Sequence, residues 1–503
     1  MSDQYYKIEH SLKDTLCAIN NCQPADLEVA GFFDTREACV VSFAQKLLSL
    51  KDKRFLVVGD YDCDGVMATT IVKRLLEKLN IEHNYYIPSR IKDGYGLNKT
   101  IVEMAINNHF EALLLVDNGV VASEALTLAK KAGLAVLIID HHEFKQEPLC
   151  DALIHPSFLN APYCDLCAGG LTYLLSTLFY QDELSLVYAG LATLADMVSV
   201  LGYNRYLLKE MLRIINSRNI YQVLLLFESK PYHIDYEDLS FSIIPKINAI
   251  SRMEPSANVN MLVRYLLADQ TTCSKVAVQI NQINRERKTL SDEYLKRAMA
   301  QIDISKPVLV YCQPDLKEGL LGILANRLMH KFNKPAIVFC ETSSGYKGSG
   351  RSVEGSDLFT YLSQFSDYYQ AFGGHLMAVG LTVKAECFSA FLKALNEQEF
   401  VYETKKALIR LEQDGLCEEL VNQLEQLKPF GQGFKEPLFI FKPLITERRL
   451  LAKRYPKFLL SDGNYALSFN EDHCAYQDQA LIGRLKRDNF KRSILAFMIE
   501  DLL

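Results

Sequence analysis

The chain has 503 residues, 49% of them hydrophobic and 23% charged, which is too long for one hydrophobic core and predicts about three domains. The absence of a long apolar run excludes a membrane-spanning helix, and the N-terminal residues lack the basic and apolar regions of an export signal. The net charge of −6 argues against a broadly basic protein, and 13 cysteines in so long a chain predict reduced cytoplasmic thiols rather than a disulfide scaffold.

The first half of the chain has the pattern of a doubly wound α/β domain. Residues 1–50 form a mainly helical lead-in, in which Phe32 and Phe33 are expected to pack on the domain that follows. Residues 51–260 alternate apolar strands with amphipathic helices, and their later part is largely helical. Cys164 and Cys167 form a CxxC pair, which we interpret as a chance pair in a loop rather than half of a zinc site, because no second CxxC exists.

An apolar run that ends in three carboxylates is the most informative feature of this domain. The run 55–59 is followed by Asp60, Asp62 and Asp64 at alternate positions. Because alternate residues of a strand share a face, these carboxylates are expected to converge at the C-terminal edge of a parallel sheet, where active sites of open α/β sheets lie. Crowded carboxylates repel one another, so the cluster predicts a site for hard divalent cations. The alternative is a polar turn in which an aspartate caps the next helix.

Two further strands and one helix repeat this design. Asp117 follows one apolar run, Asp140, His141 and His142 follow another, and Asp196 lies in a mostly apolar helix. A buried lone aspartate is costly unless it is paired or binds a metal. Oxygen ligands mixed with imidazole suit Mn²⁺ and, less well, Mg²⁺. The pattern therefore predicts a pair of metal ions that activates water for attack on phosphorus.

The rest of the chain indicates a long helix, a second α/β domain and a small barrel. Residues 262–303 contain no Pro or Gly and predict one long helix that connects two domains. Strands and helices alternate again over 305–400, and linker helices are expected over 401–436. Short strand-like runs over 437–503 fit a barrel of the OB type. The predicted fold class is therefore α/β, with two α/β domains joined by a long helix and a small C-terminal OB-like β-barrel.

The second α/β domain carries residues suited to phosphate. Glycine lets backbone approach a ligand closely, so Gly373, Gly374 and His375 form a candidate phosphate or nucleotide site. Arg351 lies in a glycine-rich run, and Arg252 follows the run Ile-Asn-Ala-Ile-Ser. The fork of an arginine matches two phosphate oxygens, although each arginine alone also fits a surface or capping role.

Basic residues concentrate in the C-terminal segment. Affinity for nucleic acid depends on local basic surface rather than on total charge. The segment therefore predicts phosphate contacts, with a solvated charged face as the alternative. Its basic residues are Arg448, Arg449, Lys453, Arg454, Lys457, Arg484, Lys486, Arg487, Lys491 and Arg492.

The order of these motifs resembles the DHH phosphoesterases. The motifs are GDYDCDG at 59–65, VDNG at 116–119, DHH at 140–142 and ADMV at 195–198. DHH alone recurs by chance, whereas the ordered set is specific. Over roughly residues 45–445 the chain is similar to the RecJ single-strand exonucleases within that superfamily. The segments that carry this second resemblance are 87–96, 195–205, 246–253, 283–287, 348–352, 371–381 and 427–433.

The resemblance implies a metal-dependent exonuclease that hydrolyses single-stranded DNA in the 5′→3′ direction and releases 5′-mononucleotides in DNA repair and recombination. It implies two Mn²⁺ or Mg²⁺ ions, with Asp117 as the bridge and Asp60 as a ligand or an outer support. Asp140 is expected to orient a metal-bound histidine, and His142 to contact the scissile phosphate. The implied metal ligands are Asp60, Asp62, Asp64, Asp117, His141 and Asp196.

The resemblance also gives roles to the second domain and to partners. Arg252, Arg351, Gly373, Gly374 and His375 are expected to grip nucleotides behind the scissile phosphate while the first domain cuts. A RecQ-type helicase and a single-strand-binding protein are implied partners. We expect a cytoplasmic monomer without membrane contact.

Three departures from the RecJ pattern and three alternatives remain open. Lys317 stands where a histidine is usual, with the acidic Glu318 beside it, and Phe434 replaces the usual asparagine. The C-terminal domain is short and diverged, which weakens the expectation of tight binding to a long strand. An oligoribonuclease or cyclic-dinucleotide phosphodiesterase of the DHH type usually lacks the long helix and the C-terminal barrel. A pyrophosphatase lacks the nucleotide-gripping motifs. An inactive RecJ-like binding protein would not need the complete Asp/His motifs.

Overall fold

The structure is a computed structural model of the chain, which divides into two compact units. The large unit comprises Phe32–Asp196 and Tyr206–Thr404, and the small unit comprises Met1–Gly31, Met197–Arg205 and Lys405–Leu503. Phe32 and Phe33, which the sequence predicted to pack on the first domain, lie outside the described residues. Within the described residues no helix is both long and apolar enough to cross a membrane. The described residues are 3–8, 11–28, 34–255, 257–343, 345–398, 400–402, 406–412, 416–475, 479–488 and 493–502.

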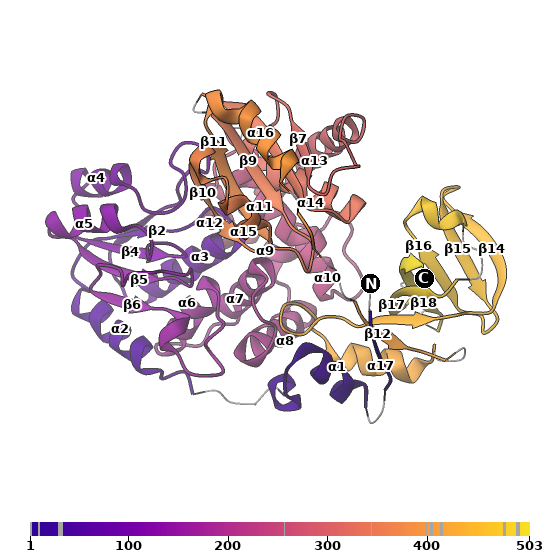
Figure 1. The fold of residues 1–503 in the computed structure, drawn as a ribbon. Helices are drawn as coiled ribbons and strands as arrows, with labels where there is room; N and C mark the ends of the chain where they lie inside the picture. Colours follow the sequence, from indigo (N-terminus) through magenta and orange to yellow (C-terminus); the bar gives the residue numbers. More distant parts are fainter. Residues whose placement is uncertain are drawn as a thin grey trace. The chain divides into compact units, whose positions relative to one another are not determined.

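A five-stranded parallel sheet in the order β3-β2-β4-β5-β6 begins the large unit. Every residue of β2 and β4 is buried, as expected for parallel strands covered on both faces. Helices α4 and α5 lie on one side of the sheet and α2 on the other (Figure 1). The strands are β2 (Phe55–Val58), β3 (His83–Tyr86), β4 (Ala112–Val116), β5 (Ala135–Ile139) and β6 (Ala152–Ile154), and the helices are α2 (Ala38–Ser49), α3 (Cys63–Lys78), α4 (Lys99–Asn107) and α5 (Ser123–Lys131).

Helices follow this sheet in the sequence. They are α6 (Ala168–Thr177), α7 (Glu183–Asp196), α8 (Gly202–Ser217), α9 (Tyr221–Leu224), α10 (Tyr236–Asp238), a π-helical turn (Leu239–Ile243) and α11 (Ile244–Arg252). Helix α3 packs against both α6 and α7. This packing sets the end of α7 beside the residues that follow β2.

Two helices stand where the sequence predicted one long helix over 262–303. Helix α12 (Asn260–Leu267) ends at Ala268, whose backbone is extended with ψ 162°. Helix α13 (Gln270–Met299) begins after Asp269, which accepts a hydrogen bond from Thr272 N at 3.0 Å. The interruption is therefore an N-cap, which a search for Pro or Gly does not find. Helix α13 packs against α11 and against α14 (Leu321–Phe332).

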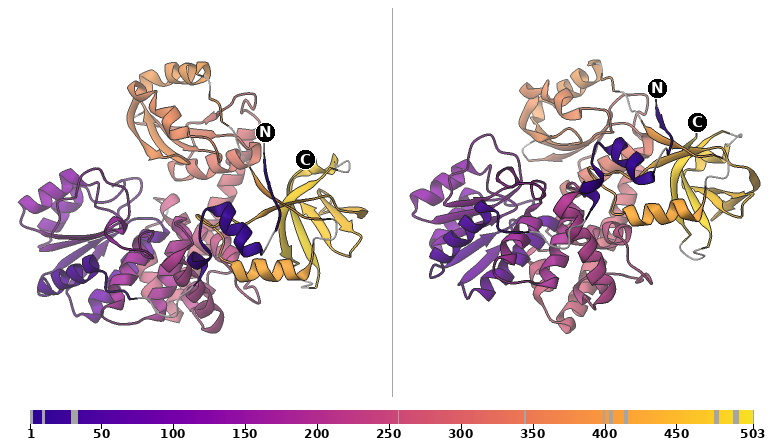
Figure 2. Two further views of the ribbon diagram at one scale, coloured as in Figure 1. Left: turned by 60° about the horizontal axis from the view of Figure 1, so that its bottom comes forward. Right: turned by 90° about the horizontal axis from the view of Figure 1, so that it is seen from below.

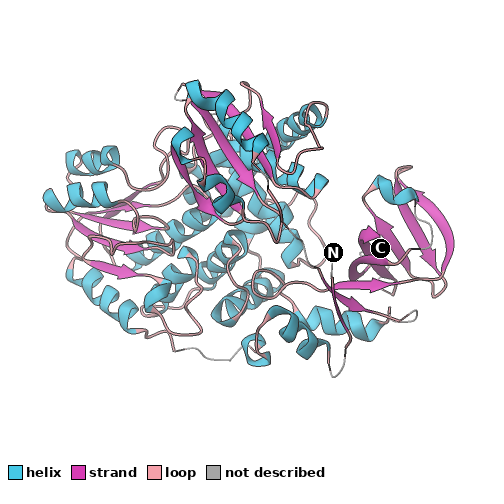
Figure 3. Cartoon of the chain, in the orientation of Figure 1, coloured by secondary structure: helices cyan, strands magenta, loops and turns pink. Residues whose placement is uncertain are grey.

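A second, mixed sheet follows α13 in the order β10-β11-β9-β8-β7. Only β7 and β8 are parallel neighbours. Strand β10 lies at one edge and is largely exposed. Helices accompany the strands of both α/β sheets (Figure 3). The elements are β7 (Leu309–Cys312), β8 (Ala336–Thr342), β9 (Gly345–Arg351), β10 (Tyr369–His375), β11 (Ala378–Val383), α15 (Leu358–Ser363) and α16 (Phe388–Glu397).

The small unit contains an eight-stranded mixed sheet in the order β1-β12-β13-β17-β18-β16-β15-β14. From the sequence, strands were predicted only over 437–503. The sheet also includes β1 (Gln4–Tyr6) and β12 (Ala407–Arg410), which pair with each other in parallel (Figure 2). Strands this short carry too little periodicity to be recognised locally. The other elements are β13 (Leu438–Phe441), β14 (Ile445–Leu451), β15 (Tyr455–Leu460), β16 (Tyr465–Ser468), β17 (Leu481–Arg487), β18 (Leu495–Leu502), α1 (Leu12–Asn20) and α17 (Glu418–Leu427).

Candidate metal centre

The aspartates after β2 meet through a turn rather than along a strand. The strand ends before Asp60, and α3 begins directly after Asp62. Asp62 is the N-cap of α3 and accepts a hydrogen bond from Gly65 N at 3.1 Å, while Asp64 lies in the first helical turn. The prediction of three carboxylates on one strand face is therefore wrong in its geometry, because the strand stops too early. The helix cap considered as the alternative is present at Asp62, and the turn still gathers the carboxylates.

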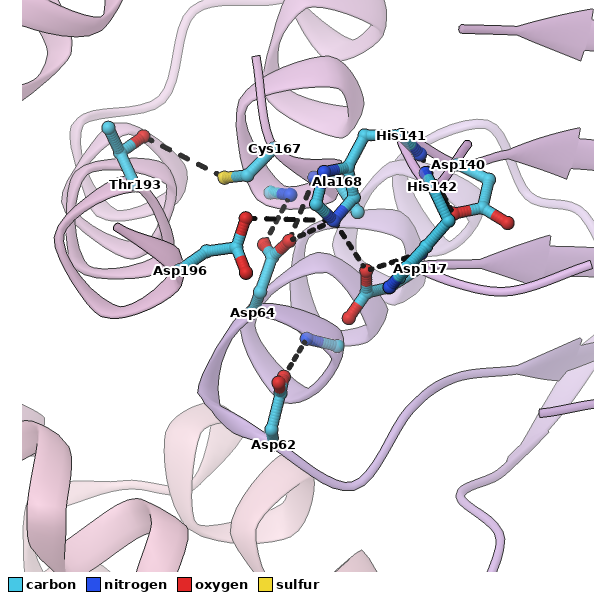
Figure 4. A network of polar contacts seen from close by, with 12 residues as sticks. Asp62, Asp64, Asp117, Asp140, His141, His142, Cys167, Ala168, Thr193 and Asp196 are labelled. Atoms are coloured by element: carbon cyan, nitrogen blue, oxygen red, sulfur yellow. Dashed lines mark hydrogen bonds and ion pairs between the residues drawn. The ribbon is translucent and has the colours of Figure 1, made fainter. Parts of the chain in front are cut away.

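Three more segments bring candidate metal ligands to the same place. Asp117 follows β4, His141 comes shortly after β5, and Asp196 is the last residue of α7. His141 Nε2 lies 3.2 Å from Asp117 Oδ1, 3.6 Å from Asp196 Oδ2 and 3.8 Å from Asp64 Oδ2 (Figure 4). Because parallel strands end at one edge of the sheet, acids that follow successive strands meet there. The convergence thus follows from the order of strands.

These side chains form three groups whose ligand atoms lie within 4.8 Å of one another. The groups are Asp60, Asp62 and Asp117; Asp64, His141 and Asp196; and Asp117, His141 and His142. Asp117 and His141 each belong to two groups. The carboxylate of Asp117 therefore has the position expected of a bridge between two cations.

The burial of these carboxylates fits a cation. The buried Oδ1 atoms of Asp60 and Asp117 accept no hydrogen bond from any described residue. Burial and neighbouring carboxylates raise the pKa of Asp64 to about 7 and that of Asp196 to about 8, and raise the pKa values of Asp60 and Asp117 well above the usual range. Such a set remains ionised at neutral pH only when cations compensate its charge. Burial also lowers the pKa of His141 to about 4, which leaves a neutral imidazole able to bind a metal.

The N-terminus of α6 holds the carboxylate of Asp64. Asp64 accepts hydrogen bonds from Gly169 N at 2.7 Å and Ala168 N at 2.9 Å, at the positive end of the helix dipole. These donors were not predicted, because their only signal in the sequence is a run of small residues at a helix start. Cys167 just before them is buried, whereas Cys164 is exposed, and both are free thiols.

Asp140 orients the second histidine of the pair. Its Oδ1 accepts hydrogen bonds from His142 Nδ1 at 2.7 Å and from the backbone N of His141 at 2.8 Å. The resemblance implied that Asp140 orients a metal-bound histidine. In the structure Asp140 holds the ring of His142, and it contacts His141 only through the backbone N of that residue. Burial opposes the protonation of His142, but the hydrogen bond and charge of Asp140 raise its pKa to about 9. Asp140 therefore favours the protonated form of His142 beside the carboxylates.

Tyr95 is a residue of the site that sequence analysis missed. Its Oη donates to Asp117 O at 2.9 Å and lies 3.1 Å from His142 Nδ1. Asp117 has a φ of 62°, in the left-handed region that non-glycine residues rarely adopt, so this contact helps to hold a strained turn. The segment 87–96 was noted for its resemblance, but nothing in the sequence indicated what its tyrosine contacts.

Arg90, Arg252 and Arg351 interact electrostatically with one another, and we call them the arginine cluster; Arg252 also interacts with Asp62, and Arg90 with Asp60. Burial and the charges of the other two lower the pKa of Arg252 to about 9, and burial with Arg90 lowers the pKa of Arg351. Guanidinium groups of like charge repel one another, and an anion such as phosphate relieves the repulsion. Asn248 of α11 accepts a hydrogen bond from Cys63 N at 2.9 Å, which ties the helix that ends at Arg252 to the start of α3. Arg90 was not identified from the sequence.

The second α/β domain meets this cluster through its first helical turn. Arg252 Nη1 donates to Gly319 O at 3.3 Å, and a Cβ at Gly319 would lie 2.3 Å from Arg252 O, so the approach requires glycine. Glu318 forms an ion pair with Lys347 at 2.7 Å, so its charge is compensated beside Lys317. Lys317 lines a surface hollow of 470 Å³ with Met253, Gln282, Arg285, Glu286, Thr289 and Leu290.

The residues Gly373, Gly374 and His375 lie on edge strand β10, and none of the three groups found among the described residues includes them. The register pairs His375 with Ala378 and Ala378 with Arg351, so His375 and Arg351 face the same side of the sheet, about 10 Å apart. A Cβ at Gly374 would lie 2.2 Å from Ala378 O, whereas one at Gly373 would meet no described atom within 4 Å. The backbone at Gly373 is therefore open to a ligand.

Three family models match the chain in sequence order. The DHH family, N-terminal domain, matches residues 54–195; the DHHA1 domain matches 305–399; and the RecJ OB domain matches 409–501. The single-stranded-DNA-specific exonuclease RecJ of Haemophilus influenzae is 27% identical over 99% of this chain and 92% of that protein. The chain is a RecJ-like member of the DHH family.

Further RecJ proteins agree in sequence and fold. RecJ of Bacillus subtilis is 29% identical over 79% of this chain and 53% of its own length, so the RecJ-like chain matches about half the length of that relative. The crystal structure of RecJ from Thermus thermophilus in complex with Mn²⁺ has a TM-score of 0.84 at 24% identity and covers 99% of this chain and 79% of that one. The predicted fold class is thereby confirmed.

In the OB-like region of the RecJ-like chain, acidic side chains compensate much of the positive charge that the composition indicates. Several of its arginines are held in ion pairs with glutamates. Lys457 differs, since its Nζ lies 3.6 Å from the ring centroid of Tyr465. Lys491 and Arg492 lie outside the described residues. The ion pairs are Arg449 with Glu447, Arg454 with Glu471, Arg484 with Glu436 and Glu500, and Arg487 with Glu418 and Glu425.

Proposed function

We propose that this RecJ-like chain is a metal-dependent exonuclease that removes 5′-mononucleotides stepwise from the 5′ end of single-stranded DNA in repair and recombination. The observation that carries the proposal is the arginine cluster beside the three Asp/His groups in one unit of the chain. Phosphates are the common partner of guanidinium forks and of divalent cations. A site that combines the arginine cluster with the Asp/His groups suits a DNA strand that is bound at one phosphate and cleaved at another.

The metal ligands in this proposal are Asp60, Asp62, Asp64, Asp117, His141 and Asp196, with Asp117 as the bridge. When bound, two Mn²⁺ or Mg²⁺ ions supply a water of lowered pKa and neutralise charge on the phosphate. Asp140 keeps His142 protonated and oriented, so that its imidazolium donates to an oxygen of the scissile phosphate. Tyr95 holds the backbone of Asp117 in place.

The arginine cluster and the Gly-Gly-His strand bind the substrate in this proposal. Arg252 and Arg351 hold a phosphate of the strand end, and Arg90 adds a third positive charge. The open backbone at Gly373 and the exposed side chain of His375 contact a neighbouring nucleotide. None of these residues belongs to the metal groups found among the described residues, so binding and hydrolysis are separable by mutation.

The first test concerns the substrate. The wild-type protein with Mn²⁺ should degrade single-stranded DNA of tens of nucleotides from its 5′ end and leave blunt duplex intact. Strands labelled at either end and resolved on a gel show the direction of cleavage and the size of the product. Faster turnover of dinucleotides or cyclic dinucleotides would instead favour an oligoribonuclease or cyclic-dinucleotide phosphodiesterase. Binding of the strand without turnover would favour an inactive RecJ-like protein.

The cellular setting belongs to the same proposal. We infer that the protein acts in the cytoplasm as a monomer, because its large unit alone holds both the metal groups and the arginine cluster. A RecQ-type helicase and a single-strand-binding protein are proposed partners, since the substrate must first be unwound. Sedimentation at working concentrations tests the monomer, and a concentration-dependent dimer with higher specific activity would contradict it.

A second prediction concerns the OB-like region. Replacing Lys453 and Lys457 by Ala should reduce the slope of log affinity against log salt by about 1.4, at about 0.7 for each phosphate contact on a single strand. Replacing Arg484 should leave the slope unchanged, because two glutamates already compensate its charge. Fluorescence anisotropy with a long strand at several salt concentrations measures both. An unchanged slope in the lysine variant would mean that these lysines form a solvated charged face and do not contact phosphates.

A further inference from the structure

The loop between β3 and α4 carries Arg90 of the arginine cluster. Arg90 lies in a turn in which the backbone N atoms of Asp93 and Gly94 donate to Ser89 O at 3.0 and 3.1 Å. Within the described residues no hydrogen bond or ion pair holds the guanidinium of Arg90, which lies 4.9 Å from the ring centroid of Tyr61. The direction of this long side chain therefore depends on how the loop backbone is held.

Glu254 holds this turn from a distant segment of the same unit. Ser89 Oγ donates to Glu254 Oε2 at 2.7 Å, and Ile91 N donates to the same oxygen at 3.4 Å. The carboxylate therefore contacts the residues on both sides of Arg90. Glu254 is only 8% exposed, and burial of a carboxylate is costly unless its oxygens accept hydrogen bonds. A glutamate at this position is thus explained by its contacts with the loop rather than by solvation.

A second contact holds the start of the loop. Ile87 N donates to Asn260 Oδ1 at 2.9 Å, and Asn260 Nδ2 donates to Ile87 O at 3.0 Å. One side chain at the start of α12 thus satisfies both backbone polar groups of Ile87. Tyr85 Oη also donates to Asn260 O at 3.3 Å. The loop is therefore fixed both where it leaves β3 and at the turn that carries Arg90.

The segment that holds the loop also carries a second arginine of the cluster. Arg252 is the last residue of α11, and Glu254 follows it closely in the sequence. Arg90 and Arg252 repel each other, and like charges move apart when their supports are mobile. Because Glu254 ties the loop of Arg90 to the end of α11, the two guanidinium groups remain together when no anion is bound.

We propose that Glu254 is a positioning residue for substrate binding, which clamps Ser89 and Ile91 and so holds Arg90 beside Arg252, ready for a phosphate of the DNA strand. A site that is ordered before binding gains affinity because the ligand does not have to order it. This inference rests on the proposed role of the arginine cluster in binding the strand. Glu254 belongs to none of the three Asp/His groups found among the described residues and acts through the loop.

Steady-state cleavage of single-stranded DNA by the full chain with Mn²⁺ tests the proposal. Glu254→Ala leaves the Ser89 hydroxyl without its acceptor and should lower kcat/KM by about tenfold, mainly through a higher KM, with unchanged affinity for Mn²⁺. Glu254→Gln keeps an acceptor oxygen at the same place and should restore most of this loss. In an Arg90→Ala background, Glu254→Ala should cause no further loss, because its effect passes through Arg90.

Asp182→Ala is the matched control. Asp182 is a partly buried carboxylate of the same unit that accepts hydrogen bonds from Arg74 and from the hydroxyl of Ser185, so its loss should lower thermal stability and spare KM. A wild-type KM in Glu254→Ala would overturn the proposal, as would an equal rise of KM in Asp182→Ala.

Two further outcomes would also overturn it. They are a loss in Glu254→Gln as large as that in Glu254→Ala, and a fully additive loss in the double variant with Arg90→Ala. If Glu254→Ala does not fold, Ser89→Ala removes the donor of the same hydrogen bond and should show the same rise of KM. If the wild type does not cleave DNA, the proposed function fails, and fluorescence anisotropy with an uncut strand and a chelator then compares the affinities of the same variants.

Discussion

Asp117→Ala should abolish cleavage of single-stranded DNA at any Mn²⁺ concentration. Asp117 belongs to two of the three groups, and as the proposed bridge it would contact both metal ions, so its loss would remove a ligand from each. Loss of the several kcal/mol that metal ions contribute to charge stabilisation corresponds to a decrease of about a thousandfold or more in kcat. Initial rates of nucleotide release, together with the metal content of the purified protein, measure the effect.

The fold should survive this change. Burial and crowded carboxylates raise the pKa of Asp117, so in the metal-free protein its removal relieves repulsion. Mn²⁺ should raise the unfolding temperature of the wild type but raise that of Asp117→Ala much less. Asp151→Ala is the control, because it removes a carboxylate paired with Lys130 at the other edge of the same sheet. Activity of the Asp117 variant within tenfold of the wild type would contradict a bridging role.

The metal centre was predictable where strand order alone determines position. Asp117 and His141 come at or just after the ends of neighbouring parallel strands, and those ends share one edge whatever the loops do. Asp62 and Asp64 do join the Asp/His groups, but not along a strand face, because the strand ends before them and a helix begins at Asp62, its N-cap. Periodicity does not report where a strand gives way to a helix.

Other residues of the candidate site could not be predicted from the sequence for a different reason. Tyr95 and Arg90 lie on the loop between β3 and α4, and their roles depend on contacts with segments far away in the sequence. The pairing of β1 with β12 joins residues 4–6 to 407–409, and no local pattern encodes such a partner. The break at Asp269 depends on one side chain that accepts one backbone hydrogen bond. Contacts of this kind become visible only once the tertiary fold is formed.

Removing an arginine of the cluster should impair substrate binding and leave the metal in place. A hydrogen bond to a charged group is worth about 1.5–3 kcal/mol, so Arg252→Ala and Arg351→Ala should each lower kcat/KM by roughly ten- to a hundredfold. His375→Ala should have a smaller effect, because its side chain is exposed on an edge strand. Arg297→Ala, which removes a partly exposed arginine paired with Asp315, is the control and should change little.

Metal content separates this outcome from damage to the catalytic centre. The three substrate variants should retain wild-type amounts of bound Mn²⁺, whereas Asp62→Ala and His141→Ala should lose it, because only the latter pair belongs to the Asp/His groups. Because Arg252 repels Arg90 and Arg351 in the absence of an anion, its removal should not destabilise the protein at this place. Loss of metal from His375→Ala would place the second α/β domain inside the catalytic centre and refute the division between binding and hydrolysis. A rate loss at unchanged metal content would assign these residues to the phosphates of the strand.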